Sequence, residues 1–356
     1  MITGNLKTSY AADEQVFDNP WKRAFLIFCL LGLAAVAVFA NDYVILIACQ
    51  MGITLLAVTG VNVVTGYTGL LSLGHAAFVA VGAYTTVIFH SLAAPLIPAA
   101  LTTVLAIPVA VAVSALVGVV VGLPSLRVKG LYLAVATLSA NFIVIFLIEL
   151  EVMSPWTGGM VGIDTPSPNL FGWELDTRRE QFVIIAALAI LGLLAAQNLF
   201  RTRVGRAFIA IRDRDYSAEI LGIALYRYKL MSFAISAAYC GLAGALFAYF
   251  YARILPEQFE LELSLMLVAA IIVGGMGRTM GPVFGVIIIV MLPEAIKVLF
   301  GAFSDGGAEA AQFLAPVQEI AFGALIVLFL LFEPFGLTQV ADRALRTLNR
   351  WPFARG

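Results

Sequence analysis

Long, uninterrupted apolar runs are the feature that most limits what this chain can fold into. Residues 25–40 and 286–292 contain no charged side chain. A membrane-spanning helix needs about 20 mostly apolar residues, whereas a strand of a membrane barrel needs about 10 and alternates polar with apolar positions. Only 12% of all residues are charged, about half of the ~25% usual in soluble domains. The sequence therefore predicts an all-α, polytopic transmembrane helical bundle, and it excludes a soluble enzyme, a disordered chain and a nucleic-acid-binding protein.

About ten spans can be placed along the chain. A polar tail, residues 1–23, precedes a membrane domain over residues 24–340, and a second tail covers residues 341–356. Segments 71–90 and 260–276 are the least certain and could be re-entrant, which leaves eight to ten spans. The candidate spans are residues 24–40, 43–64, 71–90, 97–122, 131–150, 181–199, 230–252, 260–276, 281–301 and 316–333.

The basic residues predict the orientation. The segment 200–229 is too basic for the bilayer, where each Lys or Arg costs about 2.5 kcal/mol or more, so the positive-inside rule places it in the cytoplasm. Ten spans then put both termini in the cytoplasm and residues 151–180 outside. On this map the inner side holds all but four of the 21 Lys and Arg residues. The other segments on the inner side are residues 65–70, 123–130 and 277–280.

Two apolar segments are broken by glycines on the same predicted side, at residues 64–78 and 273–285. Non-helical backbone at membrane depth persists only when protein or a watery cavity surrounds it, and paired broken segments are typical of transporters. The alternative is a pair of tight turns that need glycine for positive φ. For His75, the alternative to a role in translocation is a hydrogen bond to a backbone carbonyl that fixes the broken helix. The candidate translocation residues are Gly66, Tyr67, Thr68, Gly69, Ser72, Gly74, His75, Gly274, Gly275 and Gly277.

Residues 205–223 form a candidate helix within the basic segment. Phe208, Ile211, Ile220 and Ile223 give it a partial apolar stripe at helical spacing, and Gly222 can end it in a left-handed conformation. A helix in water with an uncovered apolar edge is suited to a partner's groove. A helix lying on the membrane surface is the alternative.

Three further features bear on function. Glu294 and Lys297 are three residues apart on one helix face, where they can pair, either as a proton relay or as a structural pair. No nucleotide-binding G-x-x-x-x-G-K-[ST] motif occurs, so any ATP must be bound by another polypeptide, and we expect no metal or other cofactor. In the outer segment, Thr157, Gly158 and Gly159 could receive a soluble binding protein or form a turn before a helix.

Several motifs resemble those of one family. G-Y-T-G-L-L-S-L-G-H-A-A-F at residues 66–78 looks like the signature of the permease subunits of branched-chain amino acid ABC importers. The rest of the chain resembles the larger, LivM-type subunit. The resemblance extends over about residues 45–340, whereas the first 24 residues match nothing. The segments that carry the LivM-type resemblance are residues 130–138, 157–163, 205–230, 241–246, 274–282 and 332–337.

This resemblance implies an ATP-driven importer in a bacterial inner membrane. Its partners would be a second, LivH-type permease subunit, two LivG/LivF-type ATPase subunits and a periplasmic binding protein. Leucine, isoleucine and valine are the implied substrates, with urea, short amides or aromatic acids as alternatives. An ion-coupled secondary transporter is the alternative of another class. In the implied ATPase-coupling loop, Ala218, Glu219 and Gly222 match the family's pattern, and Arg206, Arg212 and Asp215 belong to the same loop.

Overall fold

The computed structural model describes residues 32–93, 98–128, 130–165, 167–170, 173–174, 177–303, 308–332, 336–340 and 343. Within these ranges the chain is a helical bundle with a few two-residue strands. The tail expected at residues 1–23, and all of the tail at 341–356 except Arg343, lie outside the described residues. The long helices are α3 (Asp42–Val61), α4 (His75–Ala93), α5 (Ala99–Gly122), α6 (Leu131–Glu149), α8 (Arg178–Arg201), α9 (Arg203–Ile220), α10 (Leu225–Phe250), α11 (Leu261–Gly274), α12 (Gly281–Phe303) and α13 (Ala308–Phe332).

Helix α10 lies at the centre of the bundle and packs along α3, α4 and α5. Small residues let these helices approach closely. A Cβ on Gly82 of α4 would collide with the backbone of Gly241 in α10, and a Cβ on Gly244 of α10 would collide with Val79 of α4. Such backbone-to-backbone packing is how helices associate in lipid, where burial of apolar surface gives little driving force. The glycine-rich composition therefore builds the α4–α10 crossing.

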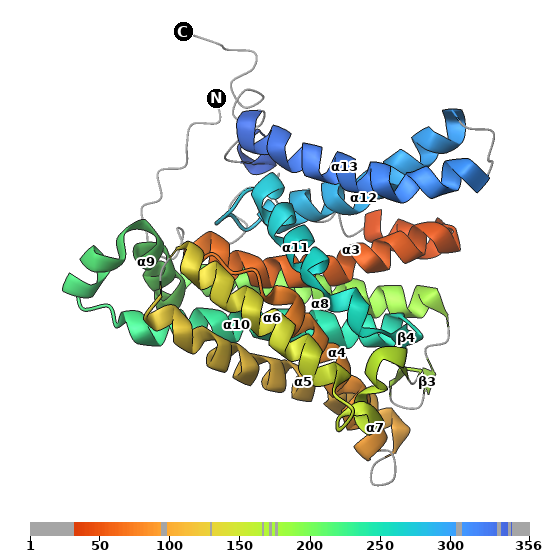
Figure 1. Cartoon of the computed structure of the whole chain (residues 1–356), viewed down its shortest axis with the longest axis horizontal. Helices are drawn as coiled ribbons and strands as arrows, with labels where there is room; N and C mark the ends of the chain where they lie inside the picture. The colour runs from red at the N-terminus through yellow and green to blue at the C-terminus, as the bar shows by residue number, and fades with distance from the viewer. Residues whose placement is uncertain are drawn as a thin grey trace.

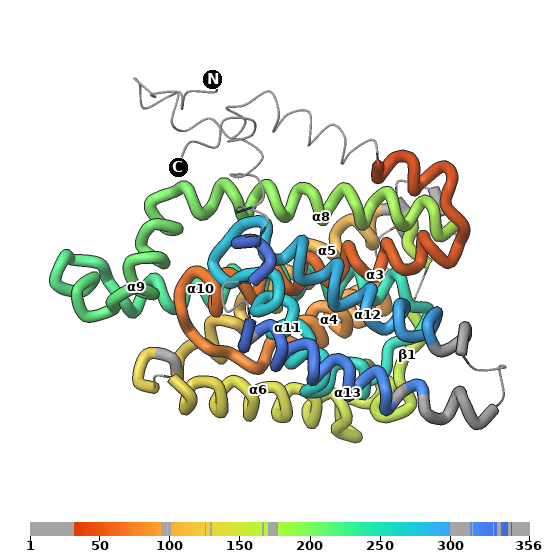
Figure 2. Tube along the Cα trace, turned by 90° about the horizontal axis from the view of Figure 1, so that it is seen from above, coloured from red at the N-terminus to blue at the C-terminus, as the bar shows by residue number. Residues whose placement is uncertain are grey.

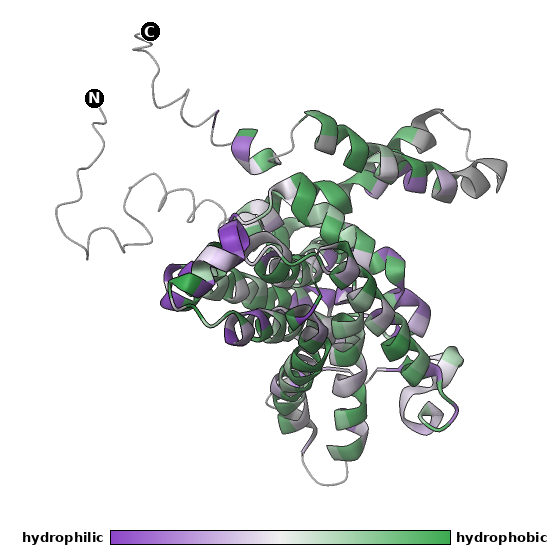
Figure 3. Ribbon diagram, turned by 60° about the vertical axis from the view of Figure 1, so that its left-hand side comes forward, coloured by the Kyte–Doolittle hydropathy of each residue, from purple (hydrophilic) through white to green (hydrophobic). Residues whose placement is uncertain are grey.

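The other helices surround this centre. Helix α8 packs on α3, α6 on α4, and α12 on α3 and α11, while α13 covers α11 and α12 (Figure 2). Hydrophobic residues cover most of the long helices, on their outer faces as well as their inner ones (Figure 3). Phe142 and Phe146 of α6, for example, are 56% and 62% exposed. Helices that are apolar all round belong in a membrane, so these outer faces meet lipid.

Seven helices within the described residues are long and apolar enough to cross a membrane. They match seven of the ten expected spans, including residues 71–90, where α4 is 19 residues long. The span expected at 260–276 is the 14-residue helix α11, only about 21 Å long at 1.5 Å per residue. Of the span expected at 24–40, residues 24–31 lie outside the described residues and residues 32–39 are helical, and the span expected at 316–333 contains a shorter apolar stretch, Pro316–Phe329.

The two ends of the bundle differ. Helix α9 projects beyond one end, and most of the short elements lie at the other (Figure 1). At that second end Ile163 and Asp164 pair with Ile254 and Arg253 in an antiparallel ladder. The short elements are η1 (Asn62–Tyr67) and η2 (Leu123–Leu126) at the α9 end, and α7 (Ser154–Thr157), η3 (Gly159–Val161), β1 (Ile163–Asp164), β2 (Asn169–Leu170), β3 (Trp173–Glu174), β4 (Arg253–Ile254) and η4 (Pro256–Phe259).

Candidate functional site

The first glycine-broken segment begins where α3 widens into the π-helical turn η1. The Thr68 amide and hydroxyl both donate to the Val63 carbonyl, at 3.2 and 2.9 Å. Residues 68–74 are then non-helical until α4 begins at His75. Thr68, Leu70, Ser72 and Gly74 are buried in this stretch, whereas Gly69 and Leu71 are exposed. Single π-turns are frequent at functional sites, and here the turn ends a membrane helix inside the protein.

The second broken segment meets the first. Helix α11 ends at Gly274, and residues 275–280 lead into α12. The Asn62 amide nitrogen donates to the Arg278 carbonyl at 2.9 Å, and its oxygen accepts from the Gly277 amide at 3.0 Å. We call this meeting point, residues 62–74 and 274–280, the glycine junction. The two segments are on the same side of the bundle, as predicted from their position relative to the basic residues.

The junction needs its glycines because backbone meets backbone there. A Cβ on Gly66 would collide with the Asn62 side chain and with the Gly277 amide. Gly277 itself has φ +70°, a conformation that side chains other than glycine disfavour. The tight-turn interpretation therefore describes this geometry, and a role of the glycine runs in translocation stays a prediction.

Arg212 of α9 joins the glycine junction from outside the bundle core. Its guanidinium donates to the Gly66 carbonyl at 3.0 Å, and Gly69 packs on its aliphatic stem. The same guanidinium lies 3.3 Å from the Asp213 carboxylate. Helix α9 therefore touches both the chain before α4 and the backbone beside Gly277.

Helix α9 differs from the helix expected at 205–223. It runs from Arg203 to Ile220 and contains a break at Arg214, where φ is −157° and ψ is 99°. Phe208 and Ile211, before the break, are buried against the bundle, but Ile220, after it, is 73% exposed. Of the partial apolar stripe expected on this helix, Phe208 and Ile211 therefore face the bundle, whereas Ile220, beyond the break, does not.

The end of α9 is built as expected from Gly222. This glycine has φ +84°, and the Ile223 amide donates to the Ala218 carbonyl at 3.0 Å, which closes the helix. We call the end of α9 and its turn, residues 215–222, the α9 tip. Ala218 is buried and Glu219 is exposed, as are Tyr216, Ile220 and Leu221.

The remaining residues of the predicted loop have local partners. The Arg206 guanidinium donates to the Arg201 carbonyl at 2.9 Å. The Asp215 carboxylate lies 4.0 Å from the ammonium of Lys229, which is buried at the start of α10. These contacts fix α9 to the ends of α8 and α10.

His75 lies in the core of the bundle. It is completely buried, and its Nε2 is 3.0 Å from the Ser236 hydroxyl, which donates to the Gly60 carbonyl at 2.7 Å. The start of α4 is also held by its neighbours. The Leu73 amide donates to the Thr137 hydroxyl of α6 at 3.0 Å, and a serine of α11 accepts from the Ala76 amide. Such side-chain partners satisfy the amides at the start of a helix.

The other predicted junction residues are also enclosed. The Tyr67 ring stacks on Phe200 of α8 with centroids 3.3 Å apart, and its hydroxyl lies 3.3 Å from that of Thr279. Ser72 is completely buried, Gly74 packs against the backbone of Thr137, and Gly274 and Gly275 close against the start of α12.

The outer candidate residues form a turn. The Thr157 hydroxyl lies 2.7 Å from the Ile148 carbonyl at the end of α6. Gly158 and Gly159, with φ +75° and +55°, then reverse the chain toward β1. This arrangement has the geometry of the turn considered as an alternative, at the end of the bundle opposite α9.

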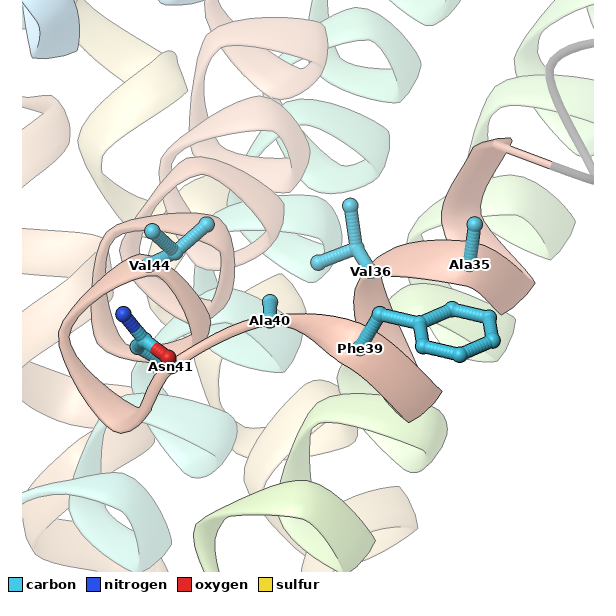
Figure 4. A pocket seen from close by; sticks show the side chains of 6 residues that line it. All are labelled: Ala35, Val36, Phe39, Ala40, Asn41 and Val44. Carbon is cyan, nitrogen blue, oxygen red and sulfur yellow. The ribbon is translucent and has the colours of Figure 1, made fainter.

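Glu294 and Lys297 do pair, as their spacing predicted. Their charged atoms are 2.8 Å apart, and the Tyr43 hydroxyl donates to the other carboxylate oxygen of Glu294. This pair links α12 to the start of α3, far from Asn62 at the other end of α3. A surface hollow lined by residues from Ala35 to Val44 lies at the same end (Figure 4). Neither feature touches the glycine junction.

Sequence reasoning missed Asn62. It singled out the glycines and hydroxyls from Gly66 onward but not the amide four residues earlier, although Asn62 is the side chain that connects the two broken segments. A buried amide in an otherwise apolar helix is the signal that could have identified it.

This geometry defines a class of protein before any comparison. Seven apolar helices, two broken segments joined at one end and a polar helix fixed to them are the features of a multi-pass membrane transporter. Within the described residues, no cluster of three or more His, Cys, Asp or Glu could hold a metal ion. The arrangement can transmit movement from α9 to the helices that the junction connects.

Comparisons with known proteins give the family. The family described as branched-chain amino acid transport system / permease component matches residues 43–330. The chain is 31% identical to the high-affinity branched-chain amino acid transport system permease protein LivM of Escherichia coli strain K12, over 82% of this chain and 68% of that protein. The chain therefore belongs to this family of permease components, and it is a transport protein rather than an enzyme.

The relatives include two kinds of permease subunit. In Methanocaldococcus jannaschii, a probable LivM protein is 26% identical over 66% of this chain and 67% of the relative. A probable LivH protein of the same organism is 29% identical over 68% of this chain and 77% of the relative. No solved structure gives a significant match to this chain.

Proposed function

We propose that this chain is the LivM-type membrane subunit of an ATP-driven importer for leucine, isoleucine and valine in a bacterial inner membrane. It pairs with a LivH-type subunit, and separate LivG/LivF-type ATPases and a periplasmic binding protein complete the transporter. The family match supports the class of function, and the LivM and LivH names of the relatives support the substrates and the pairing. The positive-inside rule supports a cytoplasmic position for both termini and for α9.

The proposed mechanism rests on the position of α9. The α9 tip exposes Tyr216, Ile220 and Leu221, which are 74%, 73% and 80% exposed beside charged neighbours. An apolar edge of this kind suits a groove on a partner, and we assign that groove to the ATPase. ATP-driven closure of the ATPases then moves α9.

The hydrogen bond from Arg212 to Gly66 is the single observation that carries this proposal. It connects the helix that the ATPase grips to the glycine junction, where α4 starts and α12 begins. Movement of α9 therefore reaches two membrane helices, and the bundle alternates between openings on its two sides. Such alternating access about broken helices is how many membrane transporters work.

Reconstitution tests the proposal. The chain is purified with the LivH-type, LivG-type and LivF-type subunits of its own genome, placed in liposomes and supplied with its binding protein. We expect leucine uptake that requires ATP inside the liposomes. Uptake by the chain alone, driven by an ion gradient, would overturn the proposal in favour of a secondary transporter. Uptake of urea, an amide or an aromatic acid in place of leucine would overturn the substrate assignment.

A further inference from the structure

Helices α5, α8 and α10 enclose an apolar cavity of about 350 Å³. Helix α8 packs on α3, and α5 packs on α10, so the cavity occupies the space left between α5 and α8. We call it the α5–α8 groove. Its apolar lining includes Val104 and Ile107 of α5, Ile184 and Leu188 of α8, and Leu246 of α10.

The open side of the groove faces the lipid. Pro108 of α5 and Ala187 of α8 both line the groove and are exposed, so they form its rim. On α8, the nearby Val183 and Leu191 are 55% and 60% exposed. Apolar outer faces of membrane helices meet hydrocarbon, and the groove is therefore open to the bilayer.

The polarity of the groove changes along its length. Helices α5 and α8 begin, and α10 ends, at the end of the bundle opposite α9. The polar side chains of the lining, Thr103, Gln181 and Tyr249, all lie near this end. Farther into the bundle the lining is hydrocarbon, as at Leu188 and Leu246. A phospholipid has the same order, with ester and phosphate groups at the membrane surface and acyl chains toward the bilayer centre.

An arginine lies at the polar end of the groove. Arg178 is the first residue of α8 and is exposed. It precedes Gln181 by three residues, which places both residues on the same side of the helix. A guanidinium group binds phosphate oxygens through paired hydrogen bonds. The polar end of the groove therefore carries the positive charge that a phospholipid headgroup requires.

The volume of the groove distinguishes an acyl chain from a helix of another subunit. A helix with its side chains is about 10–12 Å wide and rises 1.5 Å per residue, so 350 Å³ would hold only about two or three of its residues. A methylene group takes up about as much space as a water molecule, ~30 Å³. The groove therefore holds about 12 carbon atoms, which is most of one acyl chain.

We propose that the α5–α8 groove binds one acyl chain of a phospholipid from the leaflet opposite α9, and that Arg178 binds the phosphate of that lipid. The ester groups lie beside the hydroxyls of Thr103 and Tyr249, and the acyl chain fills the space between α5 and α8. This site depends on the membrane location of the chain. It does not depend on which substrate the transporter imports.

Photo-crosslinking in nanodiscs tests the proposal. The full-length chain is placed in nanodiscs of phosphatidylglycerol with a diazirine in the acyl chain, and the adducts are mapped by peptide mass spectrometry. We expect adducts concentrated on residues 103–108 of α5 and 181–188 of α8. Ile184→Trp fills the groove and should reduce the α5 adducts about tenfold. Val183→Trp adds the same side chain at the neighbouring, exposed position and should leave the α5 adducts unchanged.

Arg178→Gln is a second variant that leaves the groove itself intact. It removes the charge of an exposed side chain, so this variant tests the site even if Ile184→Trp does not fold. Loss of the phosphate contact should reduce the α5 adducts severalfold. Arg227→Gln, which removes an exposed arginine at the start of α10, is the control and should leave them unchanged.

Two results would overturn the proposal. Adducts spread evenly over all lipid-facing helices, and unchanged in Ile184→Trp and Arg178→Gln, would show only general contact with the bilayer. Adducts on α5 that disappear when the LivH-type subunit is added would show that this subunit, and not a lipid, occupies the groove. Neither result depends on leucine uptake, so the proposed function is tested separately.

Discussion

The guanidinium of Arg212 donates a hydrogen bond to the backbone carbonyl of Gly66, 146 residues earlier in the chain, at 3.0 Å. One partner belongs to the polar helix that projects from the bundle, and the other to the π-turn in which a membrane helix ends. Because the acceptor is a backbone carbonyl, substitution of Arg212 is the direct way to remove the contact. The positions of α9 and of the glycine junction are therefore tied together.

Arg212→Gln should uncouple ATP hydrolysis from transport. Glutamine is too short to keep the bond to Gly66, so α9 can move without carrying the junction along. Coupling free energies between sites usually correspond to factors of 5 to 150, and we expect about a tenfold fall in leucine imported per ATP hydrolysed. Arg227→Gln removes an exposed arginine from the same segment and should leave this ratio unchanged. An unaltered ratio in Arg212→Gln would show that the contact transmits nothing.

Asn62→Leu should destabilise the protein. Asn62 satisfies the Gly277 amide and the Arg278 carbonyl, and an unsatisfied buried group costs about 1–3 kcal/mol. Thermal unfolding of the variant and of the wild type in the same detergent gives the comparison. We expect a clear fall in melting temperature for Asn62→Leu. Equal melting temperatures would mean that the amide of Asn62 does not hold the junction together.

Gly66→Ala should impair both folding and uptake. The added methyl group meets the Asn62 side chain and the Gly277 amide, and overpacking of this kind typically costs about 1–3 kcal/mol. Gly323→Ala is the matched control, because nothing lies within 4 Å of a Cβ at that position. Yield of folded protein and ATP-driven uptake are the measurements. Full uptake by Gly66→Ala would contradict the tight packing of the junction.

Leu221→Glu should prevent capture of the ATPase subunits without affecting the fold. Leu221 is 80% exposed at the α9 tip, so the bundle loses no packing. Val152→Glu changes an equally exposed apolar residue, 81% exposed at the other end of the molecule. Co-purification with the tagged ATPases should fail for Leu221→Glu and succeed for Val152→Glu. Capture by both variants would place the ATPase elsewhere.

Glu294→Gln should leave leucine uptake unchanged. The carboxylate pairs with Lys297 and Tyr43 at the end of the bundle away from the junction, and the Lys297 side chain is 46% exposed. Exposed ion pairs are worth about 0–1 kcal/mol, so stability should hardly change either. Uptake assayed with and without a proton gradient checks this. A loss of uptake, or a new dependence on that gradient, would support the interpretation of Glu294 and Lys297 as a proton relay.

The long helices could be predicted because lipid imposes a simple pattern. Continuous apolar runs identified α3, α4, α5, α6, α8, α10 and α12 as spans. The expectation for 260–276 failed in length. Helix α11 ends at Gly274, and Gly275 has φ +117°, so the chain turns before a full span is complete. The glycines were visible in the sequence, but hydropathy alone extended the segment past them.

The site could be predicted only in part. The glycine runs indicated both halves of the junction, because close backbone contact demands glycine wherever it occurs. The contacts of Asn62 and Arg212 could not be predicted, since each joins segments about 150 residues or more apart. The break at Arg214 could not be predicted either, because it falls among charged residues and no proline or glycine lies next to it.

That break has a consequence for the exchange of partners. Before Arg214, α9 is anchored by buried Phe208 and Ile211. After it, the α9 tip carries the exposed apolar residues and keeps two contacts of its own, through buried Ala218 and through Asp215, which lies beside Lys229. The exposed positions of the tip can therefore change in sequence without disturbing the anchored half. Chimeras that take only residues 215–222 from a related permease should bind the ATPase subunits of that relative. They should keep the substrate preference of this protein.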